Sequence, residues 1–490
     1  MSAFGFLAGG VLLGIVVGAI PGLTATLAIS LLLPFTFSLP PAEALLALTG
    51  IYVGGIFGGA ITAITLRIPG APANTMTLLD GHAMARAGRA EGALGLAIFS
   101  STVGGLFGGV VLVLLAPQLA RLALRFQSPE MFSMVVLALV AVASVSVGPL
   151  SKGLAATVLG LMLSTLGLDK LVPVPRFTFG VPDLLVGVPL LPVVIGLFAL
   201  SEMFRQSAEP ESSGAGRIHL SFRGMLAFVP MLETVGFRLF AKSAAIGAFI
   251  GALPGGGAAM AAFLAYSEAK RGSDHPEKFG TGIPEGIAAP ETANNAMTGG
   301  AFVPMLAFGI PGDAVTAVIL GGLLIQGMTP GPMMFRENRE LMTTLFAGFF
   351  GAYLILFVLG LGLLPLFARM GALRRCHLYP VIAVVALVAA YASERTMFAM
   401  GLSVVVGVLG YGLTRFGYPL VPVLLGFLLG PLLETNFRRA LIVSDNGWWV
   451  FVTSPIGALL LATACLVAFW LGRGHERRFP TEPGRPPSST

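Results

Sequence analysis

The fold is decided by residues 284–335, which read PEGIAAPETANNAMTGGAFVPMLAFGIPGDAVTAVILGGLLIQGMTPGPMMF. The segment holds two acidic residues at its start, a pair of neighbouring asparagines and an Ile-Pro-Gly-Asp sequence. Apolar segments on either side are long enough to cross a bilayer. Polar side chains and Pro-Gly breaks are costly at that depth unless they line a cavity. This segment is therefore the first place to look for function.

The composition indicates a chain that crosses a membrane many times. Of its 490 residues, 56% are hydrophobic and only 11% are charged, whereas a soluble chain carries roughly 25% charged residues. The mean hydropathy is +0.89. Glycine and proline, at 65 and 34 residues, favour closely packed and interrupted membrane helices in so apolar a chain. We therefore expect an all-α polytopic membrane protein with about 11–12 transmembrane segments.

Charge and motifs argue against several other classes of protein. The net charge of +6 fits the positive-inside rule for membrane proteins, and we expect no nucleic-acid partner. The sequence lacks the G-x-x-x-x-G-K-[ST], H-E-x-x-H and G-x-S-x-G patterns, which argues against a P-loop nucleotidase, a zinc protease and a serine hydrolase. Its two cysteines and five histidines are scattered. We expect neither an enzyme nor a cofactor beyond a coupling ion.

The sequence contains an internal repeat with interrupted helices. GIVVGAIPGLTATLA from Gly14 matches GAFIGALPGGGAAMA from Gly247, and GGAITAITLRIPG from Gly58 matches GGAFVPMLAFGIPG from Gly299 with one inserted residue. Each half thus has two Pro-Gly breaks in the same order. Chance similarity in a Gly-rich chain is the alternative, but matched interrupted segments are typical of secondary transporters. We expect two repeats with Pro-Gly-broken half-helices and an inverted relation between them.

The predicted domain organisation follows from this repeat and from the polar segments. We expect a first membrane repeat at residues 1–204, a polar linker and interfacial segment at 205–242, a second membrane repeat at 243–440, a final span at 441–472, and a basic, disordered tail at 473–490.

The four breaks also predict where a ligand binds. A helix that starts inside the membrane presents free N–H groups and roughly half a positive charge, which can hold a carboxylate without any Lys or Arg. The hydroxyls of threonines there could instead bond their own helix backbone. The predicted substrate-binding residues are Gly22, Thr24, Thr26, Gly70, Asn74, Thr75, Gly255, Gly256, Asn294, Asn295, Gly312 and Thr316.

Ion coupling is expected at acidic and hydroxyl side chains of the same segment. Glu291, Asn294 or Asn295, and Thr298 are at helical spacing and share a face, so their oxygens could coordinate Na⁺ or relay a proton. Asp313 is a third candidate, although an acid at a helix start can simply complement the helix dipole. Arg67, beside the Pro69-Gly70 break, could pair with a substrate carboxylate or with Asp80.

The central segment resembles the signature of the large membrane subunit of the tripartite tricarboxylate transporters. The Pro-Glu-Gly, Ala-Asn-Asn, Gly-Ile-Pro-Gly-Asp-Ala-Val-Thr-Ala and Gly-Pro elements of that family stand at residues 284–286, 293–295, 309–317 and 331–332. The polar segment 74–89 resembles the family's other motif, built around Asp-Gly and Met-Ala. The chain departs from the family at Arg67, where a neutral polar residue is usual, and in the short segment before Gly14.

The resemblance implies a function and partners. It implies a multi-pass permease subunit in a bacterial inner membrane that imports di- or tricarboxylates or related organic acids, driven by a Na⁺ or H⁺ gradient. It also implies two partners, a small four-span membrane subunit and a periplasmic solute-binding protein. An anion channel or uniporter-like carrier is the alternative function.

Overall fold

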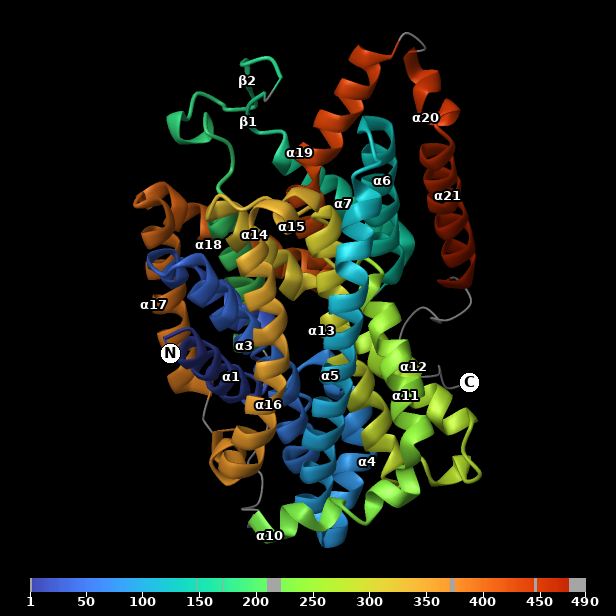
Figure 1. The fold of residues 1–490 in the computed structure, drawn as a ribbon. Coiled ribbons are helices and arrows are strands. Elements are labelled where there is room, and N and C mark those ends of the chain that lie inside the picture. The colour runs from blue at the N-terminus through green and yellow to red at the C-terminus, as the bar shows by residue number, and fades with distance from the viewer. Residues whose placement is uncertain are drawn as a thin grey trace, which may run out of the picture. The chain divides into compact units, whose positions relative to one another are not determined.

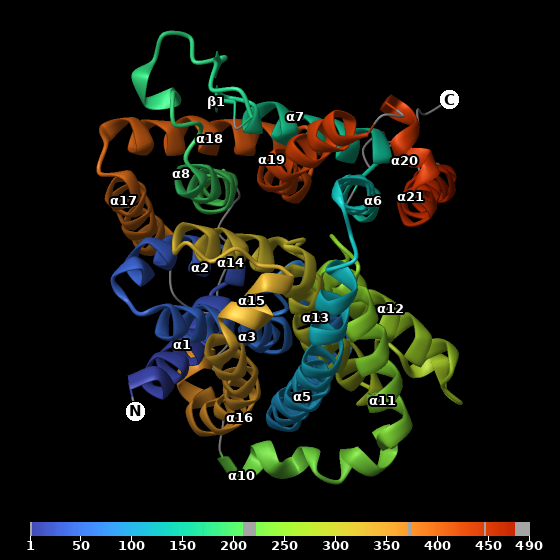
Figure 2. The same cartoon turned by 45° about the horizontal axis from the view of Figure 1, so that its top comes forward.

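The computed structural model describes residues 2–146, 148–169, 171–208, 222–370, 375–444 and 447–475. Nearly all of this part of the chain is helical, which confirms the prediction of an all-α polytopic membrane protein. The strands described are the short β1 (Gly167–Leu168) and β2 (Pro175–Arg176), which pair antiparallel with Gly167 opposite Arg176. Figures 1 and 2 show the arrangement of the helices.

The chain forms two compact units. The first comprises residues 1–125 and 178–412. Its helices are α1 (Ser2–Gly18), α2 (Ala25–Leu32), α3 (Pro41–Leu66), α4 (Thr75–Met84), α5 (Ala90–Ala123), α8 (Leu190–Val194), α9 (Ser201–Ser207), α10 (Phe222–Met225), α11 (Met231–Ala252), α12 (Gly257–Arg271), α13 (Glu285–Phe308), α14 (Ala314–Ile325), α15 (Pro332–Glu337), α16 (Arg339–Met370), α17 (Arg375–Glu394) and most of α18 (Met397–Arg415). A short 3₁₀ helix, η2 (Pro72–Asn74), precedes α4.

The second unit comprises residues 126–177 and 413–490 and contains α6 (Ser128–Val145), α7 (Leu150–Ser164), β1, β2, α19 (Leu420–Val443), α20 (Val450–Thr453) and α21 (Pro455–His475). Arg176 and Arg438 form ion pairs with Glu434 and Asp169 there. The backbone N–H of Leu171, followed by Arg438, holds the pKa of Asp169 well below its usual range. This ion-pair cluster ties the hairpin to α19.

In the part of the chain that the structure describes, eight stretches of helix are long and apolar enough to cross a membrane. Residues Gly447–Thr453 and Pro455–Phe469, which include α20 and most of α21, make a ninth if the pair, bent by 83°, is one span. The sequence predicts 11–12 spans, and the count by length and composition is lower for two reasons. Several apolar helices, such as those at Ala3–Gly18 and Ala314–Ile325, are shortened by the breaks. In addition, α13 is 24 residues long but carries many polar side chains.

Close packing of glycine faces holds α1 against α3 and α11 against α13. A Cβ added at Gly14 would lie 2.5 Å from the carbonyl oxygen of Ile51, and one at Gly18 would lie 2.5 Å from that of Gly55. In the second pair, a Cβ added at Gly247 or Gly251 would lie 2.1 or 2.2 Å from a carbonyl oxygen of α13. Small residues let the backbones approach, which is how helices associate in lipid.

The Pro-Gly sequences are helix breaks at matching places in the two halves. α1 ends before Pro21-Gly22 and α11 before Pro254-Gly255. α3 ends at a left-handed residue, Arg67 (φ 60°), and α13 at another, Gly309 (φ 71°). The amide of the next isoleucine then bonds the carbonyl six residues back in both cases, at 3.4 and 3.3 Å, which is one residue further than in a Schellman motif. Whether an axis relates the two halves stays a prediction.

Each compact unit contains helices from both predicted repeats. In the second unit, for example, α7 of the first repeat packs against α19 of the second repeat. Compact units and predicted repeats are therefore different divisions of the chain, and the repeat boundaries remain predictions. Of the predicted linker, residues 209–221 lie outside the described part of the chain. The predicted tail begins at residue 473, but α21 continues to His475. The rest of that tail also lies outside the described part of the chain.

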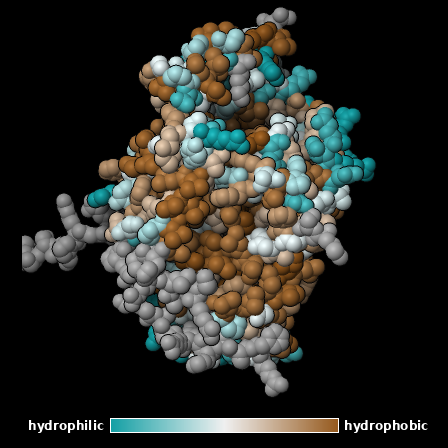
Figure 3. Space-filling model, turned by 90° about the vertical axis from the view of Figure 1, so that its left-hand side faces the viewer, coloured by the Kyte–Doolittle hydropathy of each residue, from teal (hydrophilic) through white to brown (hydrophobic). Residues whose placement is uncertain are grey.

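One face of the first unit has the apolar surface expected in lipid. Figure 3 shows the side on which α17 and α1 lie in Figure 1, and apolar side chains cover much of it. Val381, Val384 and Val388 lie about one turn apart on α17 and are 51–60% exposed. Leu12 and Leu13 of α1 are also exposed. Such an area is larger than scattered surface apolar residues explain, and it suits contact with acyl chains.

Candidate functional site

The centre of the first unit is α13, which is buried along almost its whole length. Every residue from Gly286 to Phe308 is buried. The helix packs against α5, α11 and α12, as Figure 2 shows. Its polar residues are therefore held inside protein, and each needs a hydrogen-bond partner or a ligand.

Glu291 accepts hydrogen bonds from three different elements. The Thr77 hydroxyl of α4 donates to its Oε1 at 2.6 Å, and the Ser101 hydroxyl of α5 donates to its Oε2 at 2.9 Å. The Asn74 amide of η2 lies 3.4 Å from Oε1. All four side chains are completely buried. The carboxylate thus lies among neutral partners at the junction of the two halves.

Asn295 and Thr298 form a second cluster with Tyr353 of α16. The Asn295 amide donates to the Glu291 carbonyl at 3.0 Å, and the Thr298 hydroxyl donates to the Asn295 carbonyl at 2.7 Å. The Tyr353 hydroxyl lies 2.7 Å from the Thr298 hydroxyl and donates to the Asn295 carbonyl at 3.1 Å. These two predicted site residues therefore contact neighbouring parts of the protein.

Asn294 is different, because neither its Nδ2 nor its Oδ1 has a partner although the side chain is completely buried. Asn74 Oδ1 is buried and unpartnered as well. An unsatisfied buried amide costs about 1–3 kcal/mol. Both asparagines were predicted from the sequence to bind substrate, and a ligand would satisfy them.

Asp313 and Thr316 form a capping box at the start of α14. Asp313 Oδ1 accepts from the Thr316 amide at 2.8 Å, and the Thr316 hydroxyl lies 3.0 Å from the Asp313 amide. The Tyr52 hydroxyl of α3 donates to Asp313 Oδ2 at 2.8 Å. Asp313 thus caps the start of α14, which was the alternative to a role in ion coupling. Its bond to Tyr52 also links the two halves.

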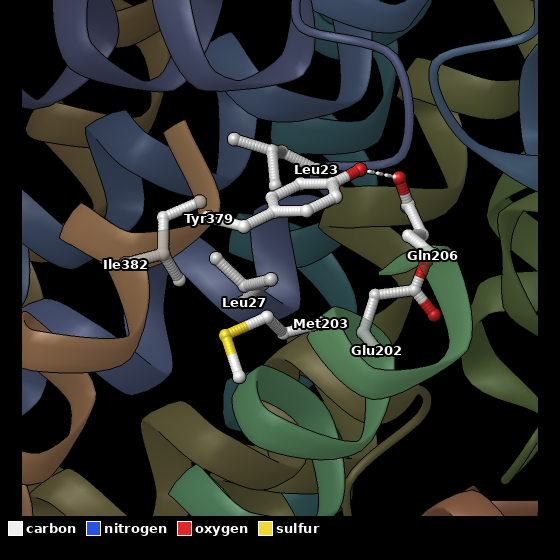
Figure 4. Close-up of a pocket in the computed structure, with 7 residues that line it drawn as sticks. All are labelled: Leu23, Leu27, Glu202, Met203, Gln206, Tyr379 and Ile382. Atoms are coloured by element: carbon white, nitrogen blue, oxygen red, sulfur yellow. Dashed lines mark hydrogen bonds between the residues drawn. The ribbon is translucent and has the colours of Figure 1, made fainter. Parts of the chain in front are cut away.

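At the first break, Pro21-Gly22, polar groups form hydrogen bonds with other parts of the protein. Thr24 is the N-cap of α2 and accepts from the Leu27 amide at 3.3 Å, while Thr26 is buried. The Gln206 amide donates to the Gly22 carbonyl at 2.6 Å and accepts from the Tyr379 hydroxyl (Figure 4). The hollow beside it has no room for a water molecule; it is lined by Leu23, Leu27, Glu202, Met203, Gln206, Tyr379 and Ile382.

The structure brings the two breaks of each half together. Within the first half, a Cβ on Gly70 would lie 2.6 Å from the Gly18 carbonyl oxygen; within the second, the Gly255 amide donates to the Gly312 carbonyl at 2.8 Å. Between the halves, α2 packs against α14 and α12 packs against η2. Gly256 precedes α12, whereas Thr75, at the start of α4, is exposed.

Arg67 and Asp80 do not form the ion pair that the sequence left open. Arg67 is exposed, in the left-handed position that ends α3. Asp80 is buried on α4 and accepts from the Tyr266 hydroxyl at 2.9 Å and from the amides of Gly280, Gly282 and Ile283 at 2.8–3.0 Å. Asp80 therefore anchors the segment that leads into α13.

Sequence reasoning missed most partners of the polar residues on α13 and α14. Thr77, Ser101, Tyr52 and Tyr353 each lie more than 50 positions away in sequence from the side chain they contact. A buried hydroxyl in an apolar helix commonly bonds its own backbone. The sequence therefore offers little indication that these hydroxyls contact the polar residues of α13 and α14. Only the tertiary contacts distinguish them from other buried hydroxyls.

Comparison with known proteins identifies relatives. The sequence profile of the tripartite tricarboxylate transporter TctA family matches residues 4–425. The chain is 39% identical over 473 residues to an uncharacterized 52.8 kDa protein in the TAR-I ttuC' 3' region of Agrobacterium vitis, covering 96% of this chain and 93% of that protein. It is 42% identical over 215 residues to an uncharacterized protein in the TAR-II ttuC' 3' region, covering 44% and 89%. No solved structure matches the chain.

Proposed function

The chain belongs to the tripartite tricarboxylate transporter TctA family, and from this we propose that it is the permease subunit of a secondary carrier that imports di- or tricarboxylates or related organic acids. The family functions in tripartite systems with a small membrane subunit and a periplasmic binding protein. We propose that this chain works with a small four-span subunit and a binding protein of that kind, in a bacterial inner membrane.

The observation that carries this proposal is the buried polar helix α13, which has unpartnered polar atoms on it and beside it and contacts the elements that follow three of the four breaks. α12, η2 and α14 contact α13, α12 also packs on η2, and α2 packs on α14. Helix starts favour anions through their free amides. The unpartnered Asn294 and Asn74 side chains supply further polar atoms. A carboxylate between the breaks would satisfy these groups, and a substrate with several carboxylates could use more than one helix start.

Nine of the twelve predicted substrate residues divide into two groups by their contacts. Asn74 and Asn294 have unpartnered side-chain atoms, and we propose them as the core of the site together with the breaks at Gly70, Gly255, Gly256 and Gly312. The amides of Gly70, Gly255 and Gly256 bond the carbonyls of Gly59, Gly312 and Leu253, so they would exchange a bond to reach substrate. Thr24, Thr316 and Asn295 have partners within the protein, so they would have to exchange a bond to reach substrate.

The energy source is proposed to be a cation gradient, of Na⁺ or H⁺. Glu291, Thr298 and Asp313 are the coupling candidates. Asp313 is engaged as an N-cap and Thr298 with Tyr353, whereas Glu291 is surrounded by hydroxyl and amide groups that can rearrange. These contacts favour Glu291.

Uptake by reconstituted liposomes tests the proposal. Liposomes holding this chain and its small subunit receive binding protein and radiolabelled citrate or another carboxylate, under a Na⁺ gradient or a pH gradient imposed separately. We expect concentrative uptake under one gradient and none when any component is omitted. Uptake that merely equilibrates, whatever gradient is imposed, would support the channel or uniporter instead.

A further inference from the structure

We propose that Glu291, Thr77, Ser101 and Asn74 form a sodium-binding site. The site would be the coupling site of the carrier, and in that respect it rests on the proposed function. Neither Thr77 nor Ser101 was predicted from the sequence, and both are identified by their contacts with Glu291.

The first argument is the charge of Glu291. Its carboxylate is completely buried, and its partners are two hydroxyls and an amide, which carry no charge. Burying an ionised carboxylate away from water costs several kcal/mol unless a cation accompanies it. Buried acids inside membrane helices accordingly mark ion pathways. A monovalent cation would neutralise the site, whereas a divalent one would leave a buried positive charge.

The second argument is the chemistry of the side chains. Hard cations are bound by carboxylate, hydroxyl and amide oxygens. The site offers both oxygens of Glu291, the hydroxyl oxygens of Thr77 and Ser101, and the amide oxygen of Asn74. These come from α13, α4, α5 and η2, so they enclose the carboxylate from several directions. A hydroxyl that now donates to Glu291 can rotate and present its lone pairs to a cation.

The third argument is the unpartnered oxygen of Asn74. With Nδ2 toward Glu291 at 3.4 Å, Oδ1 is left buried without a partner. The amide fits its space in either orientation, since its two ends have nearly the same shape. Turned over, Oδ1 would face the carboxylate, and two oxygens would repel each other unless a cation lay between them. Sodium would therefore neutralise the buried charge and give Oδ1 a ligand, while Nδ2 would move to the buried position that Oδ1 leaves.

The site also lies where a cation could affect transport. Asn74 follows the second break of the first half by four residues, and Glu291 lies on the central helix of the second half. A cation coordinated by both would hold the break against α13. Sodium occupancy is thereby linked to the geometry of the proposed substrate site.

Binding of radiolabelled Na⁺ to the purified full chain in detergent, at constant ionic strength with choline chloride, tests the site without transport. We expect saturable binding by the unmodified chain and none by Glu291→Gln. Thr77→Val and Ser101→Ala should each weaken binding about tenfold or more, as loss of one ligand-shell contact does in other metal sites. Thr102→Val is the matched control, because its hydroxyl donates to the Ile98 carbonyl of its own helix, and it should bind Na⁺ normally.

Two results would overturn the sodium site. One is undiminished binding in Thr77→Val and Ser101→Ala, which keep the charge of Glu291 and so remain informative if Glu291→Gln fails to fold. The other is an unmodified chain that binds no Na⁺, as expected if Glu291 carries a proton. Carboxylate uptake by the complete system is measured in parallel. Uptake without sodium binding removes only the site, whereas sodium binding without any carboxylate uptake contradicts the proposed function.

Discussion

Asn294 and Asn295 are neighbours on α13 with opposite hydrogen-bonding states. Asn295 bonds the Glu291 carbonyl and approaches Tyr353, whereas both polar ends of Asn294 are buried and free. A side chain that satisfies contacts within the protein contributes to stability. One that is buried without partners lowers stability, and a ligand that bonds it would recover that cost.

Alanine at each asparagine should separate these roles. Asn294→Ala removes an unsatisfied amide, so we expect an unchanged or higher melting temperature and roughly a ten- to hundred-fold loss of substrate affinity, as when a hydrogen bond to a charged ligand is lost. Asn295→Ala should cost about 1–2 kcal/mol of stability. Thermal unfolding in detergent and uptake at several substrate concentrations measure both. Wild-type uptake by Asn294→Ala would exclude it from the substrate site.

Arg67 permits a test of backbone strain against substrate binding. Its left-handed conformation costs roughly 1–2 kcal/mol for a residue with a Cβ, and the matching position in the second half is Gly309. We expect Arg67→Gly to raise stability by up to about 1 kcal/mol, after the entropic cost of glycine. Arg67→Ala should not stabilise. If the guanidinium binds substrate, both variants will lose uptake equally; if Arg67 only ends α3, both will keep it.

At this scale the sequence predicts residue types better than partners. Glu291, Asn294 and Asn295 of α13 are buried, but so is every residue of that helix from Gly286 to Phe308, so burial does not distinguish the predicted face. Thr24 and Thr316 form hydrogen bonds within the first turn of their own helices. The local sequence is compatible both with this and with substrate binding. The hydroxyls around Glu291 come from distant segments, and no local pattern identifies them.

Among the helices, glycine spacing determines which faces can meet. Gly251 lies against α13, where an added Cβ would be 2.2 Å from the Met297 carbonyl oxygen. Gly9 on α1 is exposed, with nothing within 4 Å of such a Cβ. The same residue type is thus required at one helix contact and dispensable at another.

Substitution of these glycines by alanine should have opposite effects. Gly251→Ala forces α11 from α13, and overpacking of this kind costs about 1–3 kcal/mol or more. Gly9→Ala should stabilise α1 by up to about 1 kcal/mol through helix propensity. Yield of folded protein and thermal unfolding in detergent would measure the difference. Equal stability of the two variants would contradict the close approach of α11 to α13.

The positions of the helix breaks could be predicted from the sequence, because a Pro-Gly sequence in an apolar segment usually interrupts a helix. The helices that pack against each break could not be predicted. The pairing of α2 with α14 and of α12 with η2 depends on how two halves cross, which the repeat itself does not specify. The number of spans also depends on which broken pieces are counted.

On the scale of the whole molecule, the central expectation is a pair of related halves. α1 packs on α3 as α11 packs on α13, and both pairs end in the same helix-terminating motif. We therefore expect α1–α4 to superpose on α11–α14 about a pseudo-two-fold axis in an experimental structure solved in lipid. An arrangement in which Pro21 and Pro254 occupy unrelated positions would contradict the repeat.

The most direct measurement of the central claim is counterflow of a carboxylate in liposomes that hold the complete transporter and a high internal concentration of unlabelled substrate. A carrier whose site is exposed alternately to each side predicts that external label will rise transiently above equilibrium. It predicts that Asn294→Ala, with normal assembly, will abolish this overshoot. A monotonic approach to equilibrium by the unmodified protein, or a wild-type overshoot by Asn294→Ala, would contradict the account.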